Sequence, residues 1–115
     1  KGVEKDEKQL RHHLEQAANG GHPDARYNLG IMEKEIERYE RAIKHWIIAA
    51  NLGHDGSLNV LKKAFVDGCG LVSKDDFAAA LRGHQAAVDA TKSSQRDEAE
   101  AYLQKLDAAK EARQD

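Results

Sequence analysis

Six histidines are the residues of this chain best suited to bind a metal or move a proton. His12 and His13 are adjacent, so on a helix their side chains point about 100° apart and do not readily share one ion. His22 and His54 each stand just before a helical segment, where a side chain can cap free backbone N–H groups. These four histidines therefore favour capping and surface roles over metal binding.

The other candidates for chemistry lack the partners that chemistry would need. His45 and His84 have no carboxylate or cysteine at the spacing of zinc ligands. Cys69, the single cysteine, stands between two glycines, and no catalytic motif accompanies it. The same loop lacks the glycine spacing of a phosphate-binding loop. We therefore expect no catalytic residues, no metal and no cofactor, and hence no enzyme.

The charge balance narrows the range of partners. The 115 residues carry 18 basic and 20 acidic side chains, for a net charge of −2. Nucleic-acid binding usually requires a basic stripe, and attraction to anionic lipid requires a polybasic cluster. No apolar run approaches the roughly 20 residues that cross a bilayer. One cysteine cannot form an internal disulfide. We expect a soluble protein of a reduced compartment such as the cytoplasm, with no nucleic-acid or membrane partner.

The elements that would position these residues are set by an internal repeat. The phrase "AANGGHPDARYNLG" at residues 17–30 returns at residues 49–62 as "AANLGHDGSLNVLK". A fainter third copy places Ala86 and Ala87 on Ala49 and Ala50. Self-similarity at a period between about 20 and 50 residues is typical of a solenoid. The positions of the first copy that recur in the second are Ala17, Ala18, Asn19, Gly21, His22 and Leu29.

The repeated phrase has the chemistry of a helical hairpin. Gly21 and Gly53 stand where a chain leaves a helix through a left-handed residue. Pro23 suits the first position of the next helix, where its missing N–H costs nothing. Ala25 and Leu29, four residues apart, share one face of that helix. One such hairpin cannot bury its apolar face alone, whereas stacked hairpins can. The chain is therefore predicted to be all-α, an α/α solenoid of antiparallel hairpins.

The spacing of Ala42, Trp46, Ala49, Ala50 and Gly53 resembles the Sel1-like repeat, a relative of the tetratricopeptide repeat. Residues 17–30 are similar to the same signature, and residues 65–75 resemble the loop between its helices. The resemblance covers about residues 10–90. It implies a superhelix in which Trp46 fills the core. We expect Trp46 to be buried between the second, third and fourth helices.

The chain departs from the family pattern in three places. Ser57 replaces the alanine equivalent to Ala25, and Gly83 stands where the tryptophan would recur. Residues 32–40 have lost the glycine-rich loop.

Six helices are predicted, over residues 4–19, 23–35, 37–51, 56–67 and 74–91, and from behind Ser94. Ser73 is expected to cap the fifth helix in a capping box with Asp76. Residues 1–92 would form the repeat array, about two full repeats plus half-repeats, and residues 93–115 a C-terminal helix. Because Gly83 would leave a gap, we expect that helix to turn at residues 91–94 and fold back as a cap.

The resemblance implies an adaptor that assembles other proteins on a concave helical surface. We expect Arg26, Glu33, Asn59 and Lys63 to face that surface and bind a protein or peptide. An alternative of a different class is a fragment of a longer repeat protein that serves as a spacer or self-association element. In that alternative the chain could form a homo-oligomer.

Overall fold

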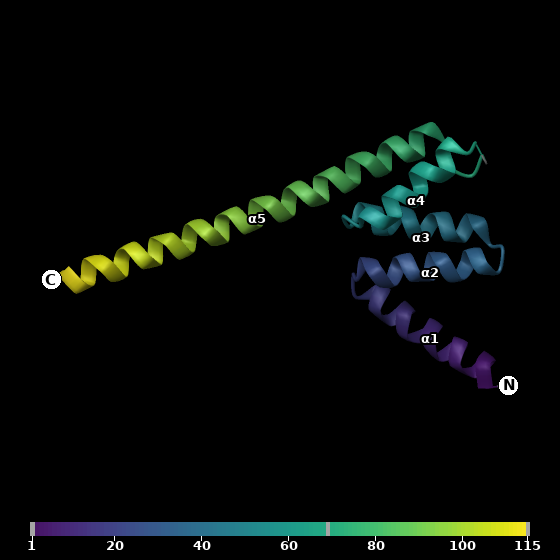
Figure 1. Cartoon of the computed structure of the whole chain (residues 1–115), viewed down its shortest axis with the longest axis horizontal. Helices are drawn as coiled ribbons and strands as arrows, with labels where there is room; N and C mark the ends of the chain where they lie inside the picture. The colour runs from purple at the N-terminus through teal and green to yellow at the C-terminus, as the bar shows by residue number, and fades with distance from the viewer. Residues whose placement is uncertain (1, 69, 115) are drawn as a thin grey trace.

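Five helices make up the described chain, and no strand occurs within that part of it. The computed structural model describes residues 2–68 and 70–114, with side chains for 5–68 and 70–112. The helices follow one another as a stack, from which the last one projects (Figure 1). The all-α expectation is confirmed. In chain order the helices are α1 (Gly2–Asn19), α2 (Pro23–Glu35), α3 (Tyr39–Asn51), α4 (Asp55–Val66) and α5 (Lys74–Gln114).

Both copies of the repeated phrase fold into the same turn. Gly21 has φ 91° and Gly53 has φ 94°, in the region that only glycine enters freely. The N–H of Gly21 donates to the carbonyl of Ala18 at 3.0 Å, and that of His22 donates to Ala17 at 3.1 Å. This pair of bonds is the Schellman closure of a helix end. The second copy repeats both bonds around Gly53, at 2.9 and 3.0 Å.

The turn between α2 and α3 reaches the same closure without glycine. The N–H of Glu37 donates to Lys34 at 2.9 Å, and that of Arg38 donates to Glu33 at 2.8 Å. Glu37 adopts φ 63°, which costs a residue with a Cβ about 1 kcal/mol. This short turn between α2 and α3 is thus closed through a strained glutamate.

The loop between α4 and α5 contains two left-handed glycines, Gly68 with φ 69° and Gly70 with φ 77°. Ser73 accepts the N–H of Asp76 through its Oγ at 3.0 Å, so the serine half of the predicted capping box is confirmed. Cys69, between these glycines, lies outside the described residues.

Trp46 is the centre of the main core and is only 4 % exposed. Its indole N–H donates to the carbonyl of Tyr27 at 3.2 Å, which satisfies the one polar atom of the ring. The ring lies against Gly30, where a Cβ would collide with it. The predicted burial of Trp46 is confirmed. The other buried members of this core are Ala42, Ile43, Ala50, Leu61, Val72 and Ala80.

The predicted sixth helix and its fold-back are wrong, because α5 runs without a break from Lys74 to Gln114. Thr91, at the expected turn, donates its hydroxyl to the carbonyl of Ala87 at 3.1 Å, as threonine does inside a helix. Alanine, glutamate, lysine, glutamine and arginine on either side favour helix, and residues 84–114 contain no glycine or proline. The boundary drawn at residue 92 falls inside this helix.

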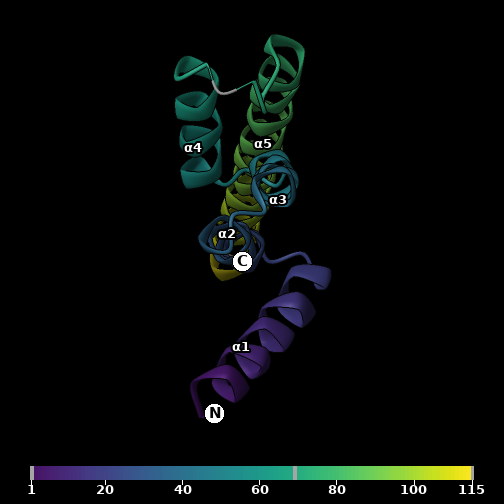
Figure 2. The same cartoon turned by 90° about the vertical axis from the view of Figure 1, so that its right-hand side faces the viewer.

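The gap expected at Gly83 does not exist. The side chain of Asn51 occupies the place where a Cβ on Gly83 would stand. Glycine therefore lets α5 approach the end of α3 closely instead of leaving a void to be capped. α5 packs against α3 and α4, and its first turns lie beside α4 (Figure 2). Its later part projects away from the stack (Figure 1).

Candidate functional site

A partly buried ion pair joins α1 to α2. Arg11 donates through a terminal guanidinium nitrogen to Oε1 of Glu33 at 2.7 Å. Glu33 is 2 % exposed, which contradicts our expectation that it faces the surface. Its position follows from spacing, because residues 25, 29 and 33 are four apart and share the buried face of α2. The sequence therefore held a signal for its burial.

Arg26 lies on the same helix, about two turns before Glu33. Its guanidinium reaches the carbonyl of Ala18 and Nδ1 of His45, both at 3.5 Å, the outer limit of a hydrogen bond. Two atoms in this region are covered and have no hydrogen-bond partner, namely Nε of Arg26 and Oε2 of Glu33. Arg26 therefore has one donor atom, and Glu33 one acceptor atom, whose hydrogen bond is not formed.

The neighbouring charges move two pKa values. Burial alone would raise the pKa of Glu33, but the hydrogen bond from Arg11 and the charges of Arg11, Arg38 and Arg41 outweigh it and lower that pKa. Burial, reinforced by the charge of Arg26, lowers the pKa of His45. Near neutral pH the site thus contains an ionised Glu33 and favours a neutral His45.

These residues line an open hollow of about 340 Å³. We call it the polar hollow. Both α1 and α3 pack against α2, and all three helices contribute to its lining. Arg11, Arg41 and Lys44 were not among the sequence-predicted binding residues. The charged residues of the polar hollow are Arg11, Glu15, Arg26, Glu33, Arg41 and Lys44.

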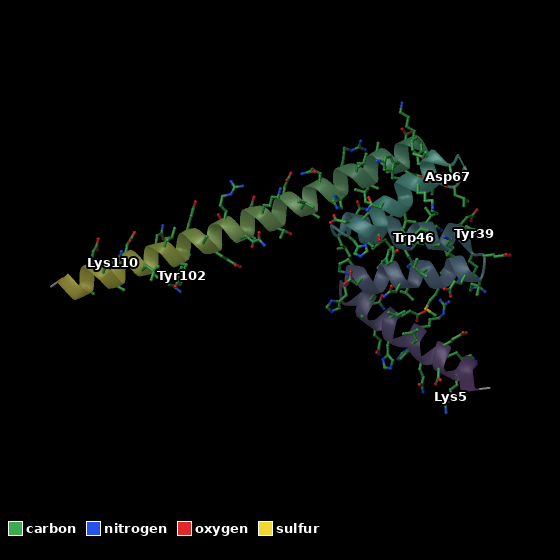
Figure 3. All side chains as sticks on the ribbon, viewed as in Figure 1. Lys5, Tyr39, Trp46, Asp67, Tyr102 and Lys110 are labelled. Carbon is green, nitrogen blue, oxygen red and sulfur yellow. The ribbon has the colours of Figure 1, made fainter. Side chains whose placement is uncertain are left out.

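The other two predicted binding residues lie elsewhere. Asn59 and Lys63 are exposed on α4, and Lys63 lines a second hollow of about 450 Å³ between α3 and α4. Trp46, Tyr39 and Asp67, which are labelled in Figure 3, also belong to its lining. The structure therefore brings Arg26 and Glu33 together and places Lys63 in a separate hollow.

A serine–histidine–aspartate array, which the sequence analysis missed, joins the second turn to α2. Nδ1 of His54 lies 2.9 Å from Oγ of Ser57, and its Nε2 lies 3.0 Å from Asp24. A nucleophile must reach its substrate, yet Ser57 is 0 % exposed. Nδ1 of His54 also accepts the N–H of Ser57 at 3.0 Å, so the imidazole caps α4. The array acts as a capping device, and the capping role expected for His54 is confirmed.

The remaining histidines are dispersed. His22 makes no side-chain cap bond, and His84 pairs with Asp55 at 2.7 Å. The rings of His12 and His13 are 6.1 Å apart and exposed on α1. Among the described residues, no three histidine, cysteine or acidic side chains are grouped closely enough to hold a metal. Within the same part of the chain, no helix has the length and apolarity to cross a bilayer.

Comparison of the chain with models of known protein families, with curated proteins and with solved structures gives no match.

Proposed function

We propose that this chain is a non-enzymatic protein–protein interaction module of the Sel1-like type, with its hairpins stacked as an α/α solenoid. The recurrence of one Schellman turn about Gly21 and Gly53 supports the repeat reading. One observation carries the binding role: the polar hollow contains a buried carboxylate, that of Glu33, with an unfilled acceptor atom. Buried polar atoms are rarely left unfilled, and a bound partner would supply the missing bond.

The position of the polar hollow suits an adaptor. It opens where two helices flank a third, so that a partner segment can contact α1, α2 and α3 together. The exposed side chains at its edge, Arg41 and Lys44, belong to a different helix from the floor residues Arg26 and Glu33. Stacked repeats bind partners along such shared surfaces.

A capture experiment with a matched control tests the proposal. The full chain is immobilised and exposed to native extract, beside an Arg41→Glu/Lys44→Glu variant. A Lys105→Glu/Lys110→Glu variant carries the same charge change on the exposed tail of α5. We expect a protein that the parent and the tail variant retain and the hollow variant loses. If the Arg41→Glu/Lys44→Glu variant captures the same protein as the parent, or if no protein is captured at all, the proposal is contradicted.

A second candidate function is self-association through α5. From residue 89 onward every described side chain of this helix is exposed, including Tyr102 at 63 %, Leu103 at 59 % and Leu106 at 42 %. Tyr102 and Lys110 lie on this projecting part (Figure 3). An isolated helix is marginal in water without tertiary contacts, so pairing with another copy would stabilise it.

Sedimentation velocity separates the two candidates. Self-association through the apolar stripe predicts a concentration-dependent dimer that Leu103→Glu/Leu106→Glu converts to a monomer. Ala101→Glu/Ala108→Glu, on the opposite side of the same helix, is the control and should leave the dimer intact. A parent chain that remains monomeric at high concentration would reject this candidate and leave the adaptor role unaffected.

A further inference from the structure

The charge of the polar hollow is opposite to that of the whole chain. Arg11, Arg26, Arg41 and Lys44 line it, against only two acidic side chains, while the chain as a whole carries −2. The Arg11 guanidinium is committed to Glu33 at 2.7 Å. The remaining three basic groups thus set a local positive field in a concave site, where field lines are concentrated.

Arg26 is the least satisfied of these cations. Among the described residues it forms no ion pair, and its two contacts, to Ala18 and His45, are both 3.5 Å long. Its Nε has no acceptor within the described part of the chain. A guanidinium binds a carboxylate through short, charge-assisted bonds, often two in parallel. The group that Arg26 lacks is therefore an anionic acceptor.

Glu33 adds a requirement of the opposite kind. Its side chain is 3 % exposed, it lines the same hollow, and its Oε2 accepts no bond. A simple anion cannot supply a hydrogen to that oxygen. A peptide can, because each non-proline residue carries an N–H donor beside whatever its side chain presents.

We propose that the polar hollow binds an acidic peptide segment, with its side-chain carboxylates on Arg26, Arg41 and Lys44 and its backbone N–H groups directed to Glu33. This assignment rests on the proposed adaptor function and specifies the chemistry of its partner. Both unfilled atoms are covered, so the segment reaches them only when neighbouring side chains shift. Ile48, 42 % exposed and also in the lining, offers an apolar contact beside the charges.

A phosphate polymer fits the hollow less well than a protein segment. Glu15 and Glu33 stand among the basic residues and would repel closely spaced phosphates. The chain outside the hollow is acidic on balance, whereas nucleic-acid binding relies on an extended basic surface. Separate carboxylates, spaced along a backbone that also donates hydrogen bonds, match the mixed lining.

Fluorescence anisotropy with defined peptides tests the assignment. The probe is a labelled ten-residue peptide of alternating glutamate and alanine, with both ends blocked so that only side-chain carboxylates are present. Its partner probe carries glutamine in place of glutamate. We expect the full chain to bind the glutamate peptide at least tenfold more tightly than the glutamine peptide, with an affinity that falls as salt rises.

Variants locate the binding. Arg41→Gln/Lys44→Gln changes only exposed residues and should weaken the glutamate peptide at least tenfold, while Lys105→Gln/Lys110→Gln should change it less than twofold. Arg26→Gln should weaken it similarly, with circular dichroism and the melting temperature verifying the fold. Equal binding of both peptides, unchanged binding to the Arg41/Lys44 variant, or tighter binding of a labelled single-stranded RNA would each overturn the assignment.

The capture experiment distinguishes failure of this assignment from failure of the proposed function. A protein lost from the Arg41→Glu/Lys44→Glu variant in extract, together with no binding of the glutamate peptide, would retain the adaptor role and reject the acidic partner. If neither the capture from extract nor the binding of the glutamate peptide is observed, both the adaptor role and the acidic partner are rejected.

Discussion

The two copies of the repeated phrase form the same backbone turn, but different side-chain interactions surround it. The turns about Gly21 and Gly53 differ by only 3° in φ and share their hydrogen bonds. Around the second turn, His54 caps α4, and its ring lies tilted against that of Tyr27 with 4.9 Å between the ring centroids. The equivalent His22 makes no cap bond. Turn geometry is thus set by one glycine, whereas the side chains around it are free to diverge.

The packing next to these turns diverges further. The α1–α2 pair has a small apolar cluster of Ala18, Ala25 and Leu29, to which the ion pair of Arg11 and Glu33 is added. The α3–α4 pair belongs to the main core around Trp46. One hairpin therefore depends on charge as well as apolar contact, and the other chiefly on a large aromatic side chain. Each prediction below acts on one side of this contrast.

The largest effect is expected from Trp46→Ala. Removing a buried aromatic side chain and leaving a cavity lowers the free energy of unfolding by about 3–5 kcal/mol. Chemical denaturation followed by circular dichroism measures the change. Tyr102→Ala, at an exposed aromatic on α5, is the control and should leave the midpoint nearly unchanged. Equal effects of the two changes would contradict the assigned core.

Glu33→Gln acts on the charged hairpin. Leaving Arg11 without a charged partner should lower the free energy of unfolding by about 1–3 kcal/mol at neutral pH. Because the folded-state pKa of Glu33 lies below its ordinary value of 4.5, its contribution is present above pH 4.5 and disappears as pH falls through the lower value. The difference between parent and variant should therefore shrink in acid. A difference that stays constant down to acidic pH would contradict the ion pair.

Gly21→Ala and Gly53→Ala test the shared backbone. Each forces a Cβ into the left-handed region and should lower the free energy of unfolding by about 1–2 kcal/mol. An added Cβ meets nothing within 4 Å at Gly21 and meets Ala87 at 3.4 Å at Gly53. The two effects should therefore be similar, as thermal unfolding can measure. An unchanged melting temperature for both variants would refute the left-handed turns.

The smallest effects separate the two histidines. His54→Ala removes a cap bond to α4 and should cost about 1 kcal/mol, the usual loss for a helix N-cap. His22→Ala removes no such bond and should leave stability almost unaltered. Paired denaturation curves provide the comparison. If His22→Ala proved as destabilising as His54→Ala, the contrast between the turns would fail.

The sequence predicted the features that depend on local chemistry. The glycine turns, the proline at the start of α2 and the burial of Trp46 all follow from residue types at fixed spacings. The failures depended on long-range packing. The fold-back of the tail assumed a void at Gly83, which the side chain of Asn51 fills from another helix. A serine-rich stretch also proved insufficient to end a helix.

The candidate site was predicted only in part, for the same reason. Arg26 and Glu33 were named from one helix, but Arg11, Arg41 and Lys44 reach the polar hollow from two others. Their convergence depends on how α1 and α3 cross α2, which residue spacing within a helix cannot reveal. The burial of Glu33, by contrast, was readable from its four-residue spacing from Leu29.

The projecting α5 also determines how the molecule moves in solution. The structure spans 70 × 40 × 16 Å, and its radius of gyration of 20.3 Å exceeds the roughly 13 Å of a compact chain of this length. A body of this shape rotates faster about its long axis than end over end. The amide N–H bonds of α5 are nearly parallel to the helix axis, which lies close to that long axis (Figure 1). While the helix stays rigid, their nuclear spin relaxation should therefore report the slow end-over-end rotation.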